Sequence, residues 1–171
     1  MLKVMGAAVL IAATTSYGFQ KAQKLQQRTT ALRVFQNGLA MLQTEVSYGH
    51  TPLPKALKNV AYTLPSPQKE FFINISYNLE KCDGFMLERY WSEELKKDTY
   101  QFLTDRDKDI LQTLGFSLGK SGIDEQLKHI SLTLNKLNAA EQESEQQYKK
   151  NGKMWKYLGF FTGLALVLVL L

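Results

Sequence analysis

Apolar residues recur at spacings of three and four along most of the chain, the pattern of amphipathic α-helices. The first stripe contains Leu32, Phe35, Leu39, Leu42 and Val46. Gly49 is expected to end that helix. No segment alternates between apolar and polar residues around a hairpin dipeptide, as paired β-strands would. The pattern therefore predicts an all-α protein.

Turn signals divide the middle of the chain into further helices. The dipeptides Thr51-Pro52 and Ser66-Pro67 each predict an N-cap followed by a first-turn proline, and residues 104–107 have the form of a capping box. The expected buried positions of the later helices are Leu53, Ala56, Leu57, Val60, Ala61 and Leu64; Phe72, Ile75 and Leu79; Leu87, Trp91 and Leu95; Ile110, Leu111, Leu114 and Leu118; and Ile123, Leu127, Ile130, Leu134 and Leu137. We therefore expect a bundle of about six helices, the first and last continuous with transmembrane helices at the N- and C-terminal ends of the chain.

Two uncharged segments, residues 4–19 and 157–171, predict membrane anchors at both ends. With their immediate flanks, each helix would rise roughly 27 to 28 Å, close to the thickness of the hydrocarbon core of a bilayer. Aromatic residues of the kind found at bilayer interfaces lie at the inner ends: Tyr17, Phe19, Trp155 and Tyr157. We therefore expect transmembrane helices at residues 1–20 and 154–171 and a helical domain at residues 21–153.

Basic residues flank both segments on the inner side alone. They are Lys21, Lys24, Arg28, Arg33, Lys149, Lys150, Lys153 and Lys156. By the positive-inside rule, this charge predicts that the domain faces the cytoplasm and that both termini lie outside. Each basic residue near anionic lipid contributes roughly 1 kcal/mol of attraction, so we expect these side chains at the membrane surface.

A cleaved signal peptide is the alternative interpretation of the N-terminal segment. Lys3 would then be its charged region, and Val4 to Ala13 its apolar region. Tyr17 and Gly18 do not form the small-residue ending that a signal peptidase prefers. Cleavage would place the domain outside the membrane, with an anchor at the C-terminus only.

The net charge of +5 belongs to these flanks and not to the body of the protein. Without Lys3 and the eight flanking residues, 12 of the 21 basic residues remain, against 16 acidic ones. A mildly acidic body argues against a nucleic-acid partner, so membrane lipid is the partner that the charge indicates.

Residues 139–153 are expected to form a polar juxtamembrane helix, because the apolar stripe ends there. Acidic residues precede basic ones in this stretch, which suits the i,i+4 pair of Glu145 with Lys149. Two interpretations stay open: a solvated stalk between the bundle and the bilayer, or a helix that packs on a partner.

The candidate catalytic motifs do not match the spacing that their chemistry requires. Gly115, Gly119, Lys120 and Ser121 imitate a phosphate-binding loop, but the spacing is one residue short and the stretch follows a helical pattern, so both glycines are interpreted as helix-end residues. The two histidines, His50 and His129, lack metal-site spacing. We therefore assign no catalytic residue, no metal ligand and no cofactor.

Small residues in the end segments indicate close helix packing. Gly159 and Gly163 form a G-x-x-x-G motif, and the stretch from Gly6 to Ala13 is also rich in small residues. Such residues let helix backbones approach each other within a membrane. The two anchors are expected to pack on each other, on other membrane helices or between copies of the chain.

Several blocks resemble the stage III sporulation protein AB family of endospore-forming firmicutes. They are residues 45–57 (EVSYGHTPLPKAL), residues 118–130 (LGKSGIDEQLKHI), the Met-Leu-Lys start and the Gly-Phe-Phe-Thr-Gly sequence at residues 159–163. The resemblance implies a component of the channel between mother cell and forespore, located in the mother-cell membrane. It also implies a domain similar to the cytoplasmic domains of platform proteins in type II secretion and type IV pilus machines.

The partners implied by this resemblance are the ATPase called stage III sporulation protein AA and other membrane proteins of the channel. The resulting hypothesis is a non-enzymatic platform subunit that links the ATPase to membrane components. The first candidates for a contact surface are Glu45, Tyr48, Gly49, His50, Pro52 and Leu53. Three alternatives stay open: a merely structural helix junction at these residues, a lipid-binding regulator, and a membrane-anchored hydrolase.

Overall fold

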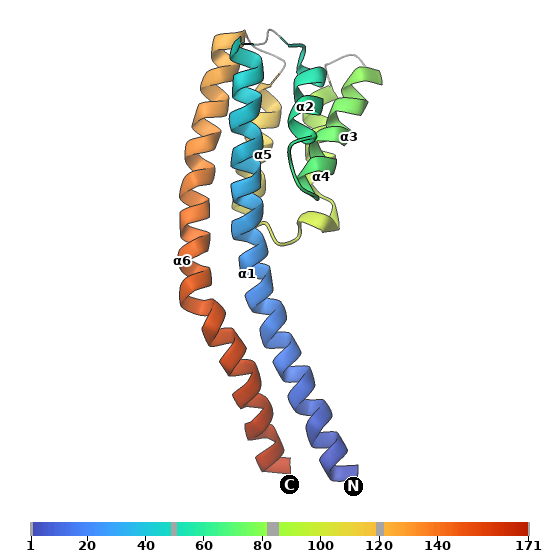
Figure 1. Cartoon of the computed structure of the whole chain (residues 1–171), viewed down its shortest axis with the longest axis vertical. Coiled ribbons are helices and arrows are strands. Elements are labelled where there is room, and N and C mark those ends of the chain that lie inside the picture. The colour runs from blue at the N-terminus through green and yellow to red at the C-terminus, as the bar shows by residue number, and fades with distance from the viewer. Residues whose placement is uncertain (1, 49–50, 82–85, 119–121, 171) are drawn as a thin grey trace. The chain divides into compact units, whose positions relative to one another are not determined.

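The computed structural model describes residues 2–48, 51–81, 86–118 and 122–170 (Figure 1). From residue 2 to 11 and from 153 to 170, side chains are described only at residues 6, 154, 155, 158, 161, 162, 165 and 167. The helices are α1 (Leu2–Tyr48), α2 (Leu53–Ala61), α3 (Gln68–Lys81), α4 (Leu87–Leu95), the short 3-10 helix η2 (Asp98–Tyr100), α5 (Asp105–Ser117) and α6 (Ile123–Leu170). Within the described ranges there are six α-helices and no strand, which confirms the all-α prediction.

The chain divides into two compact units. Unit 1 consists of Met1–Thr29 and Gln142–Leu171, and unit 2 consists of Thr30–Glu141. The helices α1 and α6 each contribute residues to both units, so the first and last helices do continue into the end segments of the chain, whereas the expected membrane-spanning character of these segments is not confirmed.

The predicted apolar stripes form the core of unit 2. In α1, the side chains of Leu32, Phe35, Leu39 and Leu42 are fully buried. The helices α2 and α3 lie side by side, α3 also packs on α4, and α4 packs on α5 (Figure 1). Residues three or four apart occupy one face of a helix, so each stripe turns toward the same interior.

Aromatic rings fill the centre of this core. The ring of Phe71 contacts Phe35 at 5.3 Å, Trp91 at 5.0 Å and Tyr100 at 5.9 Å, measured between centroids, with interplanar angles of 83° to 88°. Edge-to-face geometry places the positive edge of one ring against the negative face of another. Four segments therefore meet at one aromatic cluster, which joins α1, α3, α4 and η2.

Local signals set most helix starts, with corrections at both proline dipeptides. The helix α3 begins at Gln68, so Pro67 precedes it and is not its first-turn residue. The capping box at Thr104 and Asp107 is confirmed, since each residue bonds to the backbone amide of the other. The N-cap of α2 is Pro52 and not Thr51, so that prediction was wrong by one residue. Pro52 has an extended backbone and its carbonyl accepts the first helical hydrogen bond, from Ala56 at 3.0 Å.

Tyr100 makes the stability of unit 2 sensitive to alkaline pH. Its hydroxyl is buried and donates to the Pro67 carbonyl at 2.7 Å, and burial raises its pKa above the ordinary value of 10.0. A raised folded-state pKa gives stability that is present below about pH 10 and is lost as the pH rises further, because the unfolded chain then releases the proton first.

We expect the Tyr100→Phe variant to lose about 1 kcal/mol of unfolding free energy at neutral pH, through the missing hydrogen bond. It should also show a weaker loss of stability above about pH 10 than the parent chain. Urea unfolding measured at neutral and alkaline pH tests both effects. Parallel pH curves for the two proteins would contradict the assignment to Tyr100.

The described residues contain no helix that is both long enough and apolar enough to cross a bilayer. The transmembrane spans expected at residues 1–20 and 154–171 are therefore not confirmed, although α1 and α6 include these segments. In the first segment, Thr14, Thr15 and Ser16 follow one another and lower its mean hydropathy. In the second, most side chains lie outside the described residues.

Candidate functional site

The end of α1, the start of α2 and the start of α6 enclose a small hollow in unit 2. Its volume is about 170 Å³, and it is lined by Val46, Thr51, Leu53, Ile123 and Gln126. We call these residues, together with Tyr48 and Pro52, the junction surface. The surface thus combines three of the six predicted contact residues, Tyr48, Pro52 and Leu53, with residues that come some seventy positions later.

The predicted contact residues occupy different environments at this surface. The side chain of Tyr48 is 85% exposed, Pro52 is exposed, and Leu53 is half-buried against the core. Glu45 accepts a hydrogen bond of 3.2 Å from the Asn59 side-chain amide, so it joins α1 to α2. Gly49 and His50 lie outside the described residues. Leu53 is therefore the predicted contact residue that the structure places in the lining of the hollow, and Tyr48 lies exposed at the end of α1, the helix that supplies Val46 to this lining.

Ile123 and Gln126 were absent from the predicted contact set. Ile123 was instead expected in the buried stripe of the last helix, but its side chain is 46% exposed. A helical side chain covers the turn that precedes its own Cα. Because α6 begins at Ile123, no preceding turn of this helix lies beneath the side chain. The expected start of the last helix at Ile123 is the sequence signal that could have predicted its exposure.

The basic residues expected at a membrane surface divide into exposed and engaged side chains. Lys21, Lys24, Lys149 and Lys150 are exposed, and Lys149 pairs with Glu145 at 2.9 Å, which confirms that predicted pair. The side chains of Lys153 and Lys156 lie outside the described residues. The position of all eight basic residues relative to a membrane stays a prediction.

Arg28 and Arg33 instead bind residues of α6. In unit 1, Arg28 is buried and donates to the Gln147 side-chain carbonyl at 3.4 Å. In unit 2, a guanidinium nitrogen of Arg33 lies 2.5 Å from a carboxylate oxygen of Glu141. Both arginines therefore stabilise the pairing of α1 with α6 within their own unit.

Residues 139–153 lie within α6, and one face of their polar pattern is buried. Ala140, Glu141 and Ser144 are buried. In unit 1, the hydroxyls of Ser144 and Thr29 are 2.8 Å apart. This face is buried because α1 supplies polar partners for it, and hydrogen-bonded polar groups tolerate burial. The position of this helix between the bundle and a bilayer stays a prediction.

The remaining candidate chemistry is limited. Across the described ranges, no group of three or more His, Cys, Asp or Glu side chains is arranged to hold a metal ion. On α6, His129 lies 3.9 Å from Glu125. The packing of Gly159 and Gly163, and the stretch from Gly119 to Ser121, lie outside the residues whose surroundings are described.

Comparisons with known proteins agree with the resemblance noted in the sequence. The family model described as stage III sporulation protein AB matches residues 3–171. A protein named stage III sporulation protein AB from Bacillus subtilis (strain 168) is 38% identical over 173 residues, which cover 100% of both chains. A solved structure of a stage III sporulation protein AB is 31% identical, with a TM-score of 0.63, and the match covers 71% of this chain and 96% of that chain. The chain therefore belongs to the stage III sporulation protein AB family.

Proposed function

We propose that the protein is a non-enzymatic platform subunit of the sporulation channel between mother cell and forespore. In this role it links a cytoplasmic ATPase, stage III sporulation protein AA, to membrane components of the channel. Membership of a sporulation family supports the setting, and the all-helical fold is consistent with the similarity to secretion platform proteins. Fold similarity alone does not assign a function, so the proposal depends on a contact surface.

The junction surface is the observation that carries the proposal. The ring of Tyr48 is 85% exposed, and it belongs to the same helix end as Val46, which lines the hollow. Protein interfaces concentrate binding energy in a few aromatic or arginine anchors beside apolar pockets. An aromatic ring and a hollow on one rigid, well-packed unit are suited to capture a partner without a change in fold.

We also propose that the protein is held at the mother-cell membrane, with unit 2 facing the cytoplasm and both termini outside. The exposed lysines support this placement, because Lys21, Lys24, Lys149 and Lys150 all come from the polypeptide next to the apolar end segments. Labelling can test it: a single cysteine at exposed position 143, in a Cys82→Ser background, should react with an impermeant maleimide only after the cells are permeabilised. Reaction in intact cells would contradict the proposal that unit 2 faces the cytoplasm.

We expect Tyr48→Ala to weaken capture of the ATPase about tenfold, the loss typical of an interface anchor. The full-length protein in detergent, immobilised and titrated with the purified ATPase, provides the measurement. Tyr62→Ala is the matched control, since Tyr62 is another tyrosine of unit 2 with a 64% exposed side chain. Equal affinity of the Tyr48 variant and the parent protein would exclude the junction surface as the contact.

A further inference from the structure

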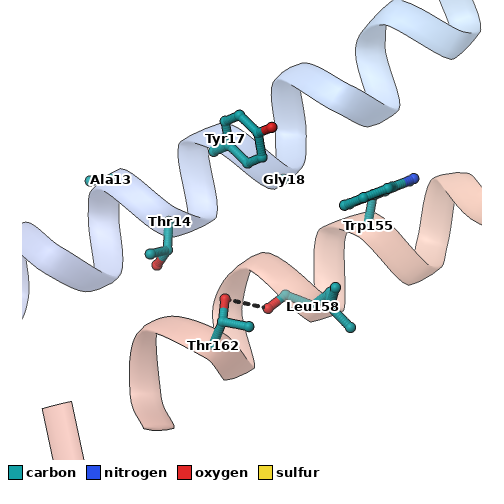
Figure 2. Close-up of a pocket in the computed structure, with 7 residues that line it drawn as sticks. All are labelled: Ala13, Thr14, Tyr17, Gly18, Trp155, Leu158 and Thr162. Carbon is teal, nitrogen blue, oxygen red and sulfur yellow. Dashed lines mark hydrogen bonds between the residues drawn. The ribbon is translucent and has the colours of Figure 1, made fainter. Parts of the chain in front are cut away.

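A second, larger hollow lies within unit 1, between the N-terminal part of α1 and the C-terminal part of α6. Its volume is about 410 Å³, and its lining consists of Ala13, Thr14, Tyr17, Gly18, Trp155, Leu158 and Thr162. Figure 2 shows Thr14 extending from α1, and Trp155 extending from α6, toward the space between the helices. The two helices therefore leave an open space here instead of close packing.

The surface that faces this hollow is almost entirely apolar. The hydroxyl of Thr162 donates to the Leu158 carbonyl at 2.7 Å, so that lining residue satisfies its polar group within its own helix. Rings of Tyr17 and Trp155 and the side chain of Leu158 supply the apolar contact area. An occupant would therefore present hydrocarbon to most of the hollow.

A positive charge lies at one side of this apolar lining. The ammonium group of Lys21 is 5.6 Å from the centroid of the Tyr17 ring, and Lys21 is exposed. No acidic residue precedes Glu45 in the sequence, so α1 carries no carboxylate in unit 1 that would compete for this cation. The complementary ligand is an amphiphile with an apolar body and a negative group at one end.

The dimensions favour a slender chain over a protein helix. The lining covers residues 13–18 of α1 and 155–162 of α6, which correspond to rises of roughly 9 and 12 Å. An α-helix with its side chains is about 10–12 Å wide and buries a stripe over several turns. A volume of about 410 Å³ is instead within the range of small-molecule sites, about 300–1,000 Å³.

We propose that this hollow binds one acyl chain of an anionic phospholipid, whose phosphate pairs with Lys21. The site rests on the membrane placement proposed above, since that placement supplies the lipid. It differs from general attraction of the basic flanks to an anionic surface, because it requires a defined apolar contact with Trp155 together with one named cation.

Tryptophan fluorescence can test the proposal in the full-length protein. The chain has two tryptophans: Trp155 lines the hollow, whereas Trp91 is fully buried in unit 2. Protein in non-ionic detergent is titrated with phosphatidylglycerol carrying brominated acyl chains, which quench a tryptophan on contact. We expect saturable quenching that disappears in the Trp155→Phe variant, and weaker binding of phosphatidylcholine with the same chains.

Two variants separate the charge from the apolar contact. Lys21→Gln should raise the half-quenching concentration of phosphatidylglycerol about fivefold and leave that of phosphatidylcholine unchanged. Lys24→Gln is the matched control, because Lys24 is exposed on the same helix but does not contact Tyr17, and it should have a clearly smaller effect. Ala13→Leu should abolish quenching by both lipids, because leucine fills the hollow while keeping helix propensity.

Three results would overturn the site. They are equal half-quenching concentrations for the two lipids, equal effects of the Lys21 and Lys24 variants, and quenching that survives in Ala13→Leu. Sedimentation that shows a dimer broken by Ala13→Leu without added lipid would assign the hollow to a second copy of the chain. Lipid binding in detergent does not require the ATPase, so its failure is distinguishable from a failure of the platform proposal.

Discussion

The Phe71→Ala variant is expected to lose about 3–5 kcal/mol of unfolding free energy, the largest effect of any single truncation proposed for this chain. Phe71 is fully buried, and its ring contacts those of Phe35, Trp91 and Tyr100. Removal of the ring opens a cavity where α1, α3, α4 and η2 meet, and the fixed helices cannot all close it. Urea unfolding followed by the emission of Trp91, in a Trp155→Phe background, provides the measurement.

A tyrosine on the same helix provides the control for Phe71. Tyr77 is 54% exposed, and its ring lies 4.2 Å from the ammonium group of Lys81. Surface truncation of this kind changes stability by about 0.5 kcal/mol or less. Similar losses for Phe71→Ala and Tyr77→Ala would show that the aromatic cluster does not dominate the stability of unit 2.

Gly115→Ala is expected to destabilise unit 2 by about 1–3 kcal/mol, although alanine is favoured over glycine in a helix by about 1 kcal/mol. Gly115 is buried within α5, and an added Cβ would lie 2.6 Å from Cγ and 2.9 Å from Cβ of Trp91. These atoms belong to the base of a fully buried side chain, so α4 and α5 must move apart. The same urea titration measures the loss.

Gly122 is the matched control for this substitution. It precedes α6, is exposed, and a Cβ built there meets no atom within 4 Å. Gly122→Ala is therefore expected to cost no more than about 1 kcal/mol of unfolding free energy, because the Gly122 carbonyl accepts the first hydrogen bond of α6 and alanine is a poorer N-cap than glycine. An equal or smaller loss for Gly115→Ala would contradict the close approach of Trp91 to α5.

Most of the helical fold of unit 2 was predictable because periodicity is a local property. The stripe from Leu32 to Val46 and the capping box at Thr104 each lie within a few turns of one helix, and both are confirmed. Tyr100 and Leu103 were missed as core residues, since they lie in η2 and the turn after it. So short a segment has no helical period from which burial can be predicted.

Only the part of the candidate site that comes from the α1–α2 segment was predictable from the sequence. The block around Tyr48 and Leu53 was chosen from the sequence, and the structure places Leu53 in the lining of the hollow and leaves Tyr48 exposed. Ile123 and Gln126 complete the hollow, but they come from the start of α6. No pattern within either segment indicates that these distant residues meet.

Sequence alone specified the helical class, most buried positions and the family, because apolar spacing, caps and family blocks are all encoded in short stretches of neighbouring residues. Three findings required the folded chain. Gly115, in the last turn of α5, closely approaches Trp91, the polar face of residues 139–153 is paired with α1, and the end segments line an apolar hollow. Each of these findings depends on which faces of distant helices pack together. That pairing is decided by side-chain packing between helices in the folded chain, so no short stretch of sequence contains it.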